Sequence, residues 1–113
     1  MGPAEFARQL RDLGHEVEEP AGTKVILKYT IPIGRRIGEQ IRLGFDVPTD
    51  FPLTPPGGPR VSPPLGHPAG AVHAAPDFGA AWEYWSRPFP NWAGTDRTVR
   101  SYMAHIRRLF QQL

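Results

Sequence analysis

Apolar residues recur at helical spacing near both ends of the chain. The first set is Phe6, Leu10 and Leu13, and the second set is Val99, Tyr102 or Met103, Ile106, Phe110 and Leu113. The first set predicts an amphipathic helix over residues 3–13, which opens on a proline suited to a first helical turn and ends before Gly14. The second set predicts a closing helix with Thr95 or Asp96 as its cap.

The hydrophobic period changes to two in the middle of the chain, as expected for strands with one buried face. The first alternating run is Val25, Leu27, Tyr29 and Ile31, and the second is Ile41, Leu43, Phe45 and Val47. A glycine-bounded turn over residues 34–38 predicts a hairpin between them. The acidic stretch 16–19 indicates an edge strand before the first run. Val61 indicates a third or fourth strand.

A proline-rich segment follows the second alternating run, and it reads Phe51-Pro52-Leu53-Thr54-Pro55-Pro56. Proline fixes φ at about −65° and favours extended geometry in the residue before it, so the segment is a stiff rod that cannot be a central strand. One interpretation is a linker, or a ligand for a partner's aromatic groove. The apolar side chains of Phe51 and Leu53, with strand patterns on both sides, favour a segment inside the fold.

Residues 65–92 show neither the helical nor the strand period of hydrophobic positions. An irregular segment of this length in a compact domain suggests a functional loop. Its large aromatic residues are Trp82, Tyr84, Trp85, Phe89 and Trp92. We expect at least two of these rings in the core, with Trp92 the first choice. The alternative is a partner-binding platform that includes Trp82 and Trp85. The order helix, antiparallel meander, proline-rich segment, long loop and helix predicts an α+β fold with helices against one face of a sheet.

The composition narrows the class of protein. The chain has 113 residues, 40% of them hydrophobic, which predicts one domain over residues 1–113 with a small core. Its net charge of +2 is too small to indicate nucleic-acid binding. The sequence has no cysteine, which excludes a disulfide, a thiolate nucleophile and a cysteine metal site. No apolar run approaches the roughly 20 residues that span a bilayer, and no signal-peptide core is present, so we expect a cytoplasmic protein. We expect no cofactor, because no glycine-rich phosphate loop precedes a helix.

The element order and three motifs resemble ubiquitin-conjugating enzymes, most of all their compact prokaryotic branch. The motifs are the aromatic-Pro-x-x-Pro-Pro segment at residues 51–56, the His67-Pro68 pair, and a tryptophan before the closing helix. The resemblance covers nearly the whole chain. It implies a UBC-like fold and a bacterial pathway whose partners are an activating enzyme and a ubiquitin-like protein. In that family the first helix receives the activating enzyme, so Arg8 and Arg11 are the matching partner-binding positions.

The sequence departs from this family at the catalytic position. The family carries the modifier as a thioester on a cysteine downstream of His-Pro-Asn, whereas this chain has no cysteine and Ala69 replaces the asparagine. Between His67 and Trp92 the only aliphatic hydroxyl is that of Ser86. We therefore consider an oxyester on Ser86, or a thioester on a cysteine if the natural protein has one that this sequence lacks. The alternative is that the Ser86 hydroxyl caps a turn before Pro88.

A serine nucleophile needs a general base and a donor for the tetrahedral oxyanion. His73 is the first choice for the base and His67 the second, while Arg87 or a backbone N–H could supply the donor. His67, His73 and Asp77 could also ligate a metal, but their spacing matches no familiar pattern, so turn-stabilising or surface roles are favoured.

Arginines gather at two predicted surfaces, the hairpin tip and the last helix. They are Arg35, Arg36, Arg97, Arg100, Arg107 and Arg108. A nucleic-acid binder would interleave such residues with aromatics on a sheet face. We interpret them as a solvated face, or as docking charges for an acidic partner.

Two functions follow as hypotheses. The first is a conjugating-type transferase that accepts the C-terminus of a ubiquitin-like protein from its activating enzyme, with Ser86, His73, His67 and Arg87 in the catalytic roles. The second is a catalytically silent variant that scaffolds the conjugation complex or binds the ubiquitin-like protein non-covalently. A proline-rich adaptor without affinity for any ubiquitin-like protein is a third interpretation.

Overall fold

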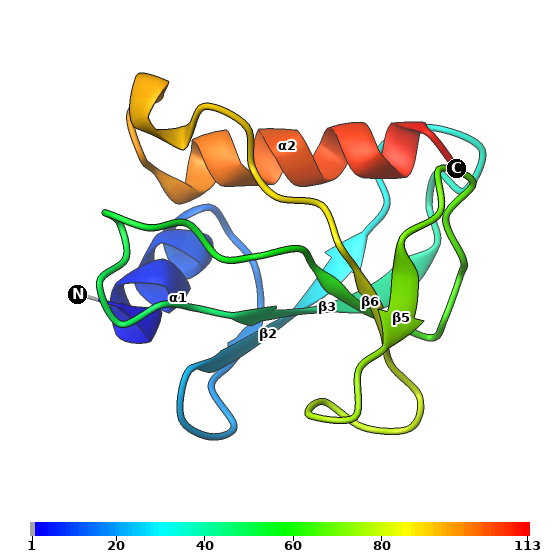
Figure 1. Ribbon diagram of the computed structural model, residues 1–113, viewed down its shortest axis with the longest axis horizontal. Coiled ribbons are helices and arrows are strands. Elements are labelled where there is room, and N and C mark those ends of the chain that lie inside the picture. The colour runs from blue at the N-terminus through cyan, green and yellow to red at the C-terminus, as the bar shows by residue number, and fades with distance from the viewer. Residues whose placement is uncertain (1) are drawn as a thin grey trace.

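A computed structural model describes residues 2–113 of the chain. In that part of the chain, two α-helices lie on one face of a six-stranded antiparallel sheet (Figure 1). The helices are α1 (Pro3–Asp12) and α2 (Val99–Gln111), with a short 3-10 helix, η1 (Trp92–Gly94), ahead of α2. The strands are β1 (Val17–Glu18), β2 (Lys24–Thr30), β3 (Gln40–Asp46), β4 (Arg60–Ser62), β5 (Val72–Ala74) and β6 (Glu83–Trp85). Their order across the sheet is β1-β2-β3-β4-β6-β5, and the arrangement confirms the predicted α+β class.

The alternating apolar positions of β2 and β3 meet on the face of the sheet that the helices cover. The register pairs Val25 with Phe45, Leu27 with Leu43 and Tyr29 with Ile41, and all of these side chains are buried. Burial of one such side chain contributes roughly 1.5–3 kcal/mol, so this face provides much of the driving force for folding. The predicted meander is confirmed, including the edge strand β1 and the strand at Val61.

Phe6 is the residue through which α1 enters the core. Its ring stands edge-on to the rings of Phe45, Phe51 and Tyr102, with centroid distances of 5.4, 5.2 and 5.8 Å. The two helices are also tied together directly, because Oε1 of Gln9 accepts a hydrogen bond from the Val99 N–H (2.8 Å). No helix within residues 2–113 has the length and apolar content that crossing a membrane requires.

The start of α2 differs from the prediction. Thr98, and neither Thr95 nor Asp96, is the cap, because its side chain accepts a hydrogen bond from the Ser101 N–H. Arg97 has a φ of 56°, which lies outside helical geometry and delays the helix. Thr95 and Asp96 instead stabilise the turn before the cap, where they accept hydrogen bonds from the N–H groups of Arg97 and Thr98.

The proline-rich segment packs against the helix-covered face through its first residue. Phe51 is fully buried and precedes a cis peptide bond to Pro52. The carbonyl of Pro52 accepts a hydrogen bond from the indole N–H of Trp92 (2.9 Å), which fixes the segment to η1. Leu53 points outward and remains 64% exposed.

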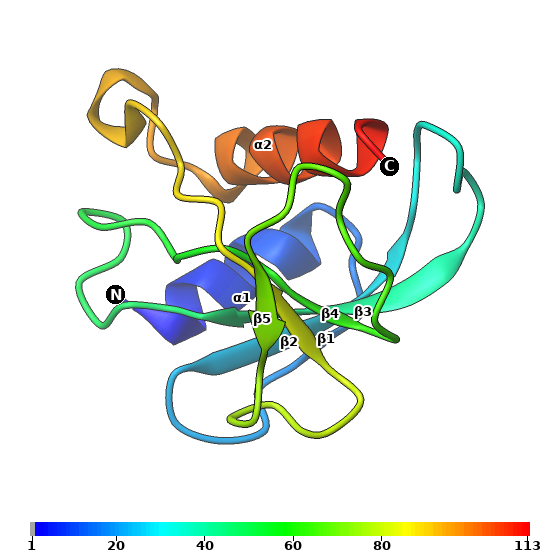
Figure 2. The same ribbon diagram turned by 45° about the vertical axis from the view of Figure 1, so that its right-hand side comes forward.

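Residues 65–92 contain a hairpin that the sequence pattern did not reveal. Strands β5 and β6 pair His73 with Tyr84, and β6 also pairs with β4 (Figure 2). Each strand has three residues, too few for a period of two to stand out. Glu83 is also buried at a position where the pattern of a half-buried strand calls for an apolar residue.

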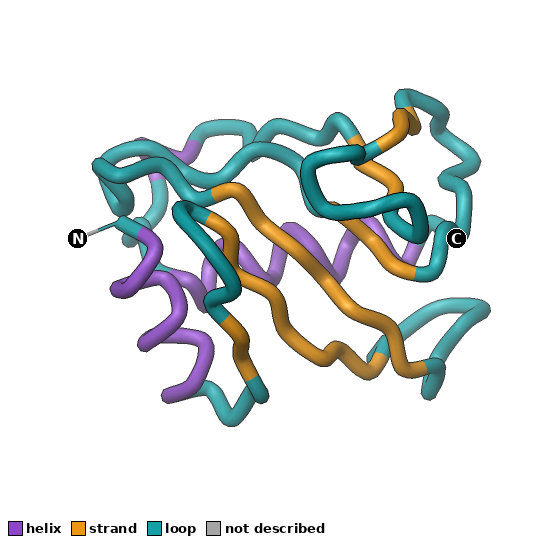
Figure 3. The backbone as a smooth tube through the Cα atoms, turned by 90° about the horizontal axis from the view of Figure 1, so that it is seen from below, coloured by secondary structure: helices purple, strands orange, loops and turns teal. Residues whose placement is uncertain are grey.

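The sheet face that the helices leave open carries a second, smaller apolar cluster. Ile26, Ala75 and Trp82 are its buried members, with Phe78 packed against them. Figure 3, seen from below, shows the loop between β5 and β6 in front of the sheet. Gly44 permits this approach, since a Cβ at that position would lie 2.4 Å from the Phe78 ring. The loop therefore covers part of the outer face.

Candidate functional site

Three of the predicted site residues, Ser86, Arg87 and His67, lie close together where β6 ends. Ser86 follows the last residue of that strand, and its N–H donates to the carbonyl of Ala71 (3.0 Å). The next side chain, Arg87, donates from Nη1 to the carbonyl of Ser86 (3.0 Å) and from Nη2 to the carbonyl of Gly70 (2.5 Å). Arg87 thereby joins the end of β6 to the turn that contains His67 and Pro68.

His67 is held by hydrogen bonds at both ring nitrogens. The side chain is only 7% exposed, and Nε2 lies 3.0 Å from the carbonyl oxygen of Leu109 in α2. Because a carbonyl can only accept, Nε2 carries the proton. Nδ1 accepts from the Ala69 N–H (3.2 Å) and lies 3.2 Å from Nη2 of Arg87. The ring is thus fixed as one tautomer, with no free lone pair directed at Ser86.

Glu83 also holds the candidate site together, although the sequence patterns did not point to it. Its side chain is buried, and Oε2 accepts hydrogen bonds from the N–H groups of Leu65 and Gly66, at 2.7 Å each, and from the indole of Trp85 at 2.9 Å. A carboxylate that accepts several N–H groups can be buried at a tolerable cost. The sequence signal was a single acidic residue between aromatics, in Trp82-Glu83-Tyr84-Trp85.

His73 does not form a pair with Ser86. It is exposed on β5, and its ring lies beside that of Tyr84 with a centroid distance of 6.2 Å. Among the residues that the structure describes, no hydrogen bond joins the Ser86 hydroxyl to His73 or His67. The structure therefore brings Ser86, Arg87 and His67 into one region without assembling a nucleophile and base.

His105 supports the same region from α2. The side chain is buried, and its Nε2 lies 3.3 Å from the carbonyl of Arg87. Burial lowers the pKa of His105 below 6.5, although the hydrogen bond to the Arg87 carbonyl opposes the shift. The neutral ring donates from Nε2 and fixes the backbone just after Ser86.

The partner-binding candidates fall into two groups. Trp85 is fully buried against Phe110, with a centroid distance of 5.1 Å, so it has no surface to offer to a partner and belongs to the core. Trp82 is 8% exposed, and the Arg42 guanidinium lies 5.3 Å from its ring centroid. With Trp92 also buried, the expectation that at least two of the aromatic rings lie in the core is confirmed.

Arg8 and Arg11 remain on the exposed face of α1. Arg8 pairs with Glu5 (2.5 Å) and Asp12 (2.7 Å), while Arg11 pairs with Glu19 (3.0 Å). The hydrogen bond from Arg8 lowers the pKa of Glu5 to about 2. Such surface pairs are worth little and exchange readily, so both guanidinium groups stay available to a partner.

The structure does not bring the histidines and Asp77 together as metal ligands. Asp77 lies 3.6 Å from Arg60 as an ion pair, and His67 is bound to α2. Within residues 2–113, no group of three or more His, Asp or Glu side chains has a geometry that could hold a metal ion.

No protein-family model, no curated protein and no solved structure matches this chain.

Proposed function

We propose that this protein is a catalytically silent, UBC-like binding module of a bacterial ubiquitin-like modification pathway. It binds the ubiquitin-like protein or its activating enzyme non-covalently and scaffolds their complex. The resemblance to ubiquitin-conjugating enzymes supplies the pathway, and the hydrogen bonds of His67 and Arg87 supply the argument against chemistry at Ser86.

A serine can attack an acyl group only if a base within reach takes its proton. Nε2 of His67 donates to Leu109, and Nδ1 already accepts from the Ala69 N–H. The remaining histidine of the hairpin, His73, has its ring beside Tyr84. The Ser86 hydroxyl is left without a base, which favours binding over acyl transfer.

Arg87, the proposed donor to the oxyanion, is likewise already hydrogen-bonded to other groups. The guanidinium of Arg87 already donates to the carbonyls of Ser86 and Gly70. Redirecting it to an oxyanion would leave those carbonyls without their partner and would loosen the turn at His67. The same contacts suit a rigid scaffold, in which Arg87 and Glu83 hold the turn from two sides.

The exposed face of α1 is the proposed docking surface for the partner, and it carries Arg8 and Arg11. Their side chains are 58% and 48% exposed, and their ion pairs lie at the surface. Carboxylates on an acidic partner surface would pair with these two arginines in place of Glu5, Asp12 and Glu19. Rim charges of this kind act mainly on the association rate.

A second candidate function is oxyester formation at Ser86. The position of Ser86 favours this function. The residue is half-buried, directly follows β6 and adjoins the Arg87 guanidinium. A bound partner would have to reorient His73 or release His67 to activate the hydroxyl.

Reconstitution separates the two candidates. The protein is mixed with ATP and with the ubiquitin-like protein and activating enzyme encoded beside its gene, and both adducts and reversible binding are measured. We expect reversible binding by calorimetry, no covalent adduct, and unchanged binding in Ser86→Ala. An ATP-dependent adduct that survives reductant, is released by hydroxide and disappears in Ser86→Ala would overturn the proposal in favour of the second candidate.

The docking surface has its own test in the same system. Arg8→Ala combined with Arg11→Ala should weaken binding roughly tenfold at low salt, mostly through slower association. The matched control is Arg100→Ala with Arg108→Ala on the exposed side of α2, which should leave binding unchanged. If neither an adduct nor binding is observed, both candidates fail and the adaptor interpretation remains.

A further inference from the structure

Strand β2 is longer than its outer neighbour β1, so part of its edge has no strand beside it. Strand β1 pairs Val17 with Leu27 and Glu18 with Ile26, so it covers only part of β2. Beyond that point the chain turns into α1 at Gly14, whose φ is 93°. The last residues of β2 therefore have a neighbouring strand on the β3 side only, and their other side is an open edge of the sheet.

The hydrogen-bond pattern shows which main-chain groups face this edge. In an antiparallel pair, residues bonded to the neighbouring strand alternate with residues that point away from it. The Ile31 N–H donates to Glu39 on the β3 side (2.9 Å), so the N–H and C=O of Thr30 point the other way. The main-chain groups of Lys28 point in the same direction as those of Thr30, and the Lys28 N–H donates to the carbonyl of Glu16 (3.2 Å).

The strand position opposite Thr30 is not filled by the protein's own chain. Continuing the register of β1 would place Gly14 there, but the Gly14 N–H donates to Arg11 at the end of α1 (2.9 Å). Thr30 thus presents one main-chain donor and one acceptor, spaced for a bonded antiparallel pair. Exposed strand edges of this kind are templates for another extended segment.

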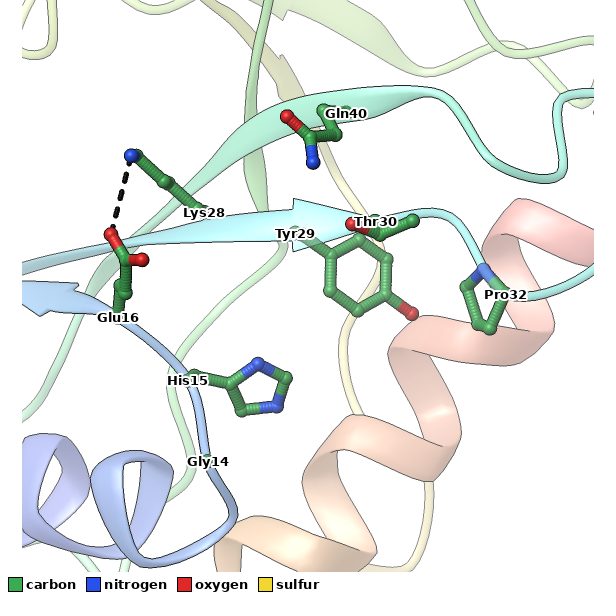
Figure 4. A pocket seen from close by; sticks show the side chains of 8 residues that line it. All are labelled: Gly14, His15, Glu16, Lys28, Tyr29, Thr30, Pro32 and Gln40. Atoms are coloured by element: carbon green, nitrogen blue, oxygen red, sulfur yellow. Dashed lines mark ion pairs between the residues drawn. The ribbon is translucent and has the colours of Figure 1, made fainter.

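A cavity of about 420 Å³ opens at this edge, as Figure 4 shows. The rings of His15 and Tyr29 form its inner wall, with a centroid distance of 6.4 Å. Lys28 and Glu16, which form an ion pair at 3.2 Å, lie at its rim. Burial raises the pKa of Tyr29 to about 12, so its hydroxyl stays protonated and can donate a hydrogen bond.

The charge at this edge is positive. The Lys28 ammonium is balanced by the Glu16 carboxylate. Arg107, exposed on α2, lies close enough for its charge to lower the pKa of Tyr29 against the effect of burial. Two cations and one carboxylate favour a ligand that brings an acidic group.

We propose that this edge binds an extended peptide, which adds to β2 as an antiparallel strand. The peptide residue opposite Thr30 exchanges both main-chain hydrogen bonds with it. Because side chains alternate between the faces of a sheet, the next peptide residue places its side chain on the Tyr29 side, in the cavity. That residue is apolar or aromatic. An acidic residue beside it lies on the other face of the sheet, near Lys28. The main chain supplies affinity and the cavity supplies selectivity, as in other cases of strand addition.

This site shares no residue with the turn at Ser86, so it goes beyond the proposed function and does not depend on it. The probe is a displayed library of random 12-residue peptides selected on the wild-type protein. Selected peptides should combine an apolar or aromatic residue with a neighbouring acidic one. Their affinities are then compared in variants by fluorescence anisotropy.

Thr30→Pro removes the main-chain N–H of Thr30 that points to the edge, and proline is tolerated where an edge N–H faces solvent. It should weaken peptide binding at least tenfold. The matched control is Thr30→Val, which keeps the N–H and should bind as the wild type does. Circular dichroism checks that both variants fold.

Amide hydrogen exchange of the wild-type protein provides a readout that does not depend on a variant. A bound peptide should slow exchange of the Thr30 N–H at least tenfold and leave the Ile31 N–H, already bonded to Glu39, unchanged. The proposal is overturned if the library yields no binder, if selected peptides bind Thr30→Pro as tightly as the wild type, or if the Thr30 amide is not protected.

Discussion

The buried carboxylate of Glu83 organises the turn ahead of His67. One of its oxygens accepts hydrogen bonds from two main-chain N–H groups and from the Trp85 indole. His67 then reaches α2 through Leu109, and Arg87 closes the turn from the other side. At the scale of single residues, the candidate site is thus held by polar side chains that each satisfy several partners.

Replacing Glu83 should therefore destabilise the protein strongly. Glu83→Ala leaves the buried Trp85 indole N–H and two part-buried main-chain N–H groups without an acceptor, and we expect the free energy of unfolding to fall by roughly 3 kcal/mol. Glu83→Gln keeps one acceptor oxygen and should cost about half as much. Urea unfolding followed by circular dichroism measures both. A loss below about 1 kcal/mol in Glu83→Ala would show that the three hydrogen bonds contribute little.

Buried His105 and half-buried His15 make stability depend on pH in a defined direction. Burial lowers the pKa values of His105 and His15 below 6.5, so between their folded values and 6.5 the unfolded chain binds more protons than the folded protein. Stability therefore rises with pH through that range and is lost as the pH falls below about 6.5. His105→Gln, which can still donate to the Arg87 carbonyl, should flatten the dependence of unfolding free energy on pH between about 7 and 5. An unchanged slope would contradict the assignment to His105.

Elements with a regular pattern could be predicted from the sequence, and elements set by single contacts could not. Strands β2 and β3 are half-buried over seven residues each, long enough for the alternation to show. The β5–β6 hairpin is short and places a carboxylate in the core, where only the N–H groups of a distant turn make its burial tolerable. For the site, Ser86, Arg87 and His67 could be named from the sequence. The hydrogen bonds that occupy His67 depend on Leu109 of α2, which lies far along the chain.

The absence of a side chain at Gly58 allows the segment before β4 to lie close to the end of β6. A Cβ there would lie 1.7 Å from the Trp85 carbonyl oxygen and 2.8 Å from the Arg87 nitrogen. Gly58→Ala must displace this backbone and should cost about 3 kcal/mol or more. Gly57→Ala is the matched control, because its nearest neighbour is the Tyr84 hydroxyl at 3.5 Å, and it should cost less than about 0.5 kcal/mol. Similar losses for the two variants in urea unfolding would argue against this close approach.

The cap of α2 is a further feature that depends on one side chain. Thr98 accepts from the Ser101 N–H, and Asp96 accepts from the Thr98 N–H and from the Ser101 hydroxyl. Thr98→Ala should lower the free energy of unfolding by about 1 kcal/mol, as loss of a helix cap does. Thr98→Ser keeps the hydroxyl and should be close to the wild type. Equal losses in both variants would show that the methyl group, and not the hydrogen bond, is what matters.

At the scale of the whole fold, residues 2–113 contain one large core and one small outer cluster. The large core joins both helices to the inner face of the sheet, and it includes Trp85 and Trp92. The outer cluster contains Trp82 and is linked to the sheet by Ile26, a residue of β2 whose neighbours Val25 and Leu27 lie in the large core. Because one strand contributes to both clusters, we infer that neither can come apart without disturbing the other.

This connection predicts a single cooperative unfolding transition. In urea, far-ultraviolet circular dichroism and tryptophan fluorescence should give the same midpoint and the same m-value, of about 1–3 kcal/mol per molar urea. The three tryptophans separate the two clusters, because Trp82→Phe leaves only Trp85 and Trp92 to report on the large core. We expect the two signals of Trp82→Phe to coincide as they do in the wild type, at a slightly lower midpoint. An early fluorescence phase in the wild type that disappears in Trp82→Phe would mean that the outer cluster opens first. The loop between β5 and β6 would then be a separate unit that can leave the sheet.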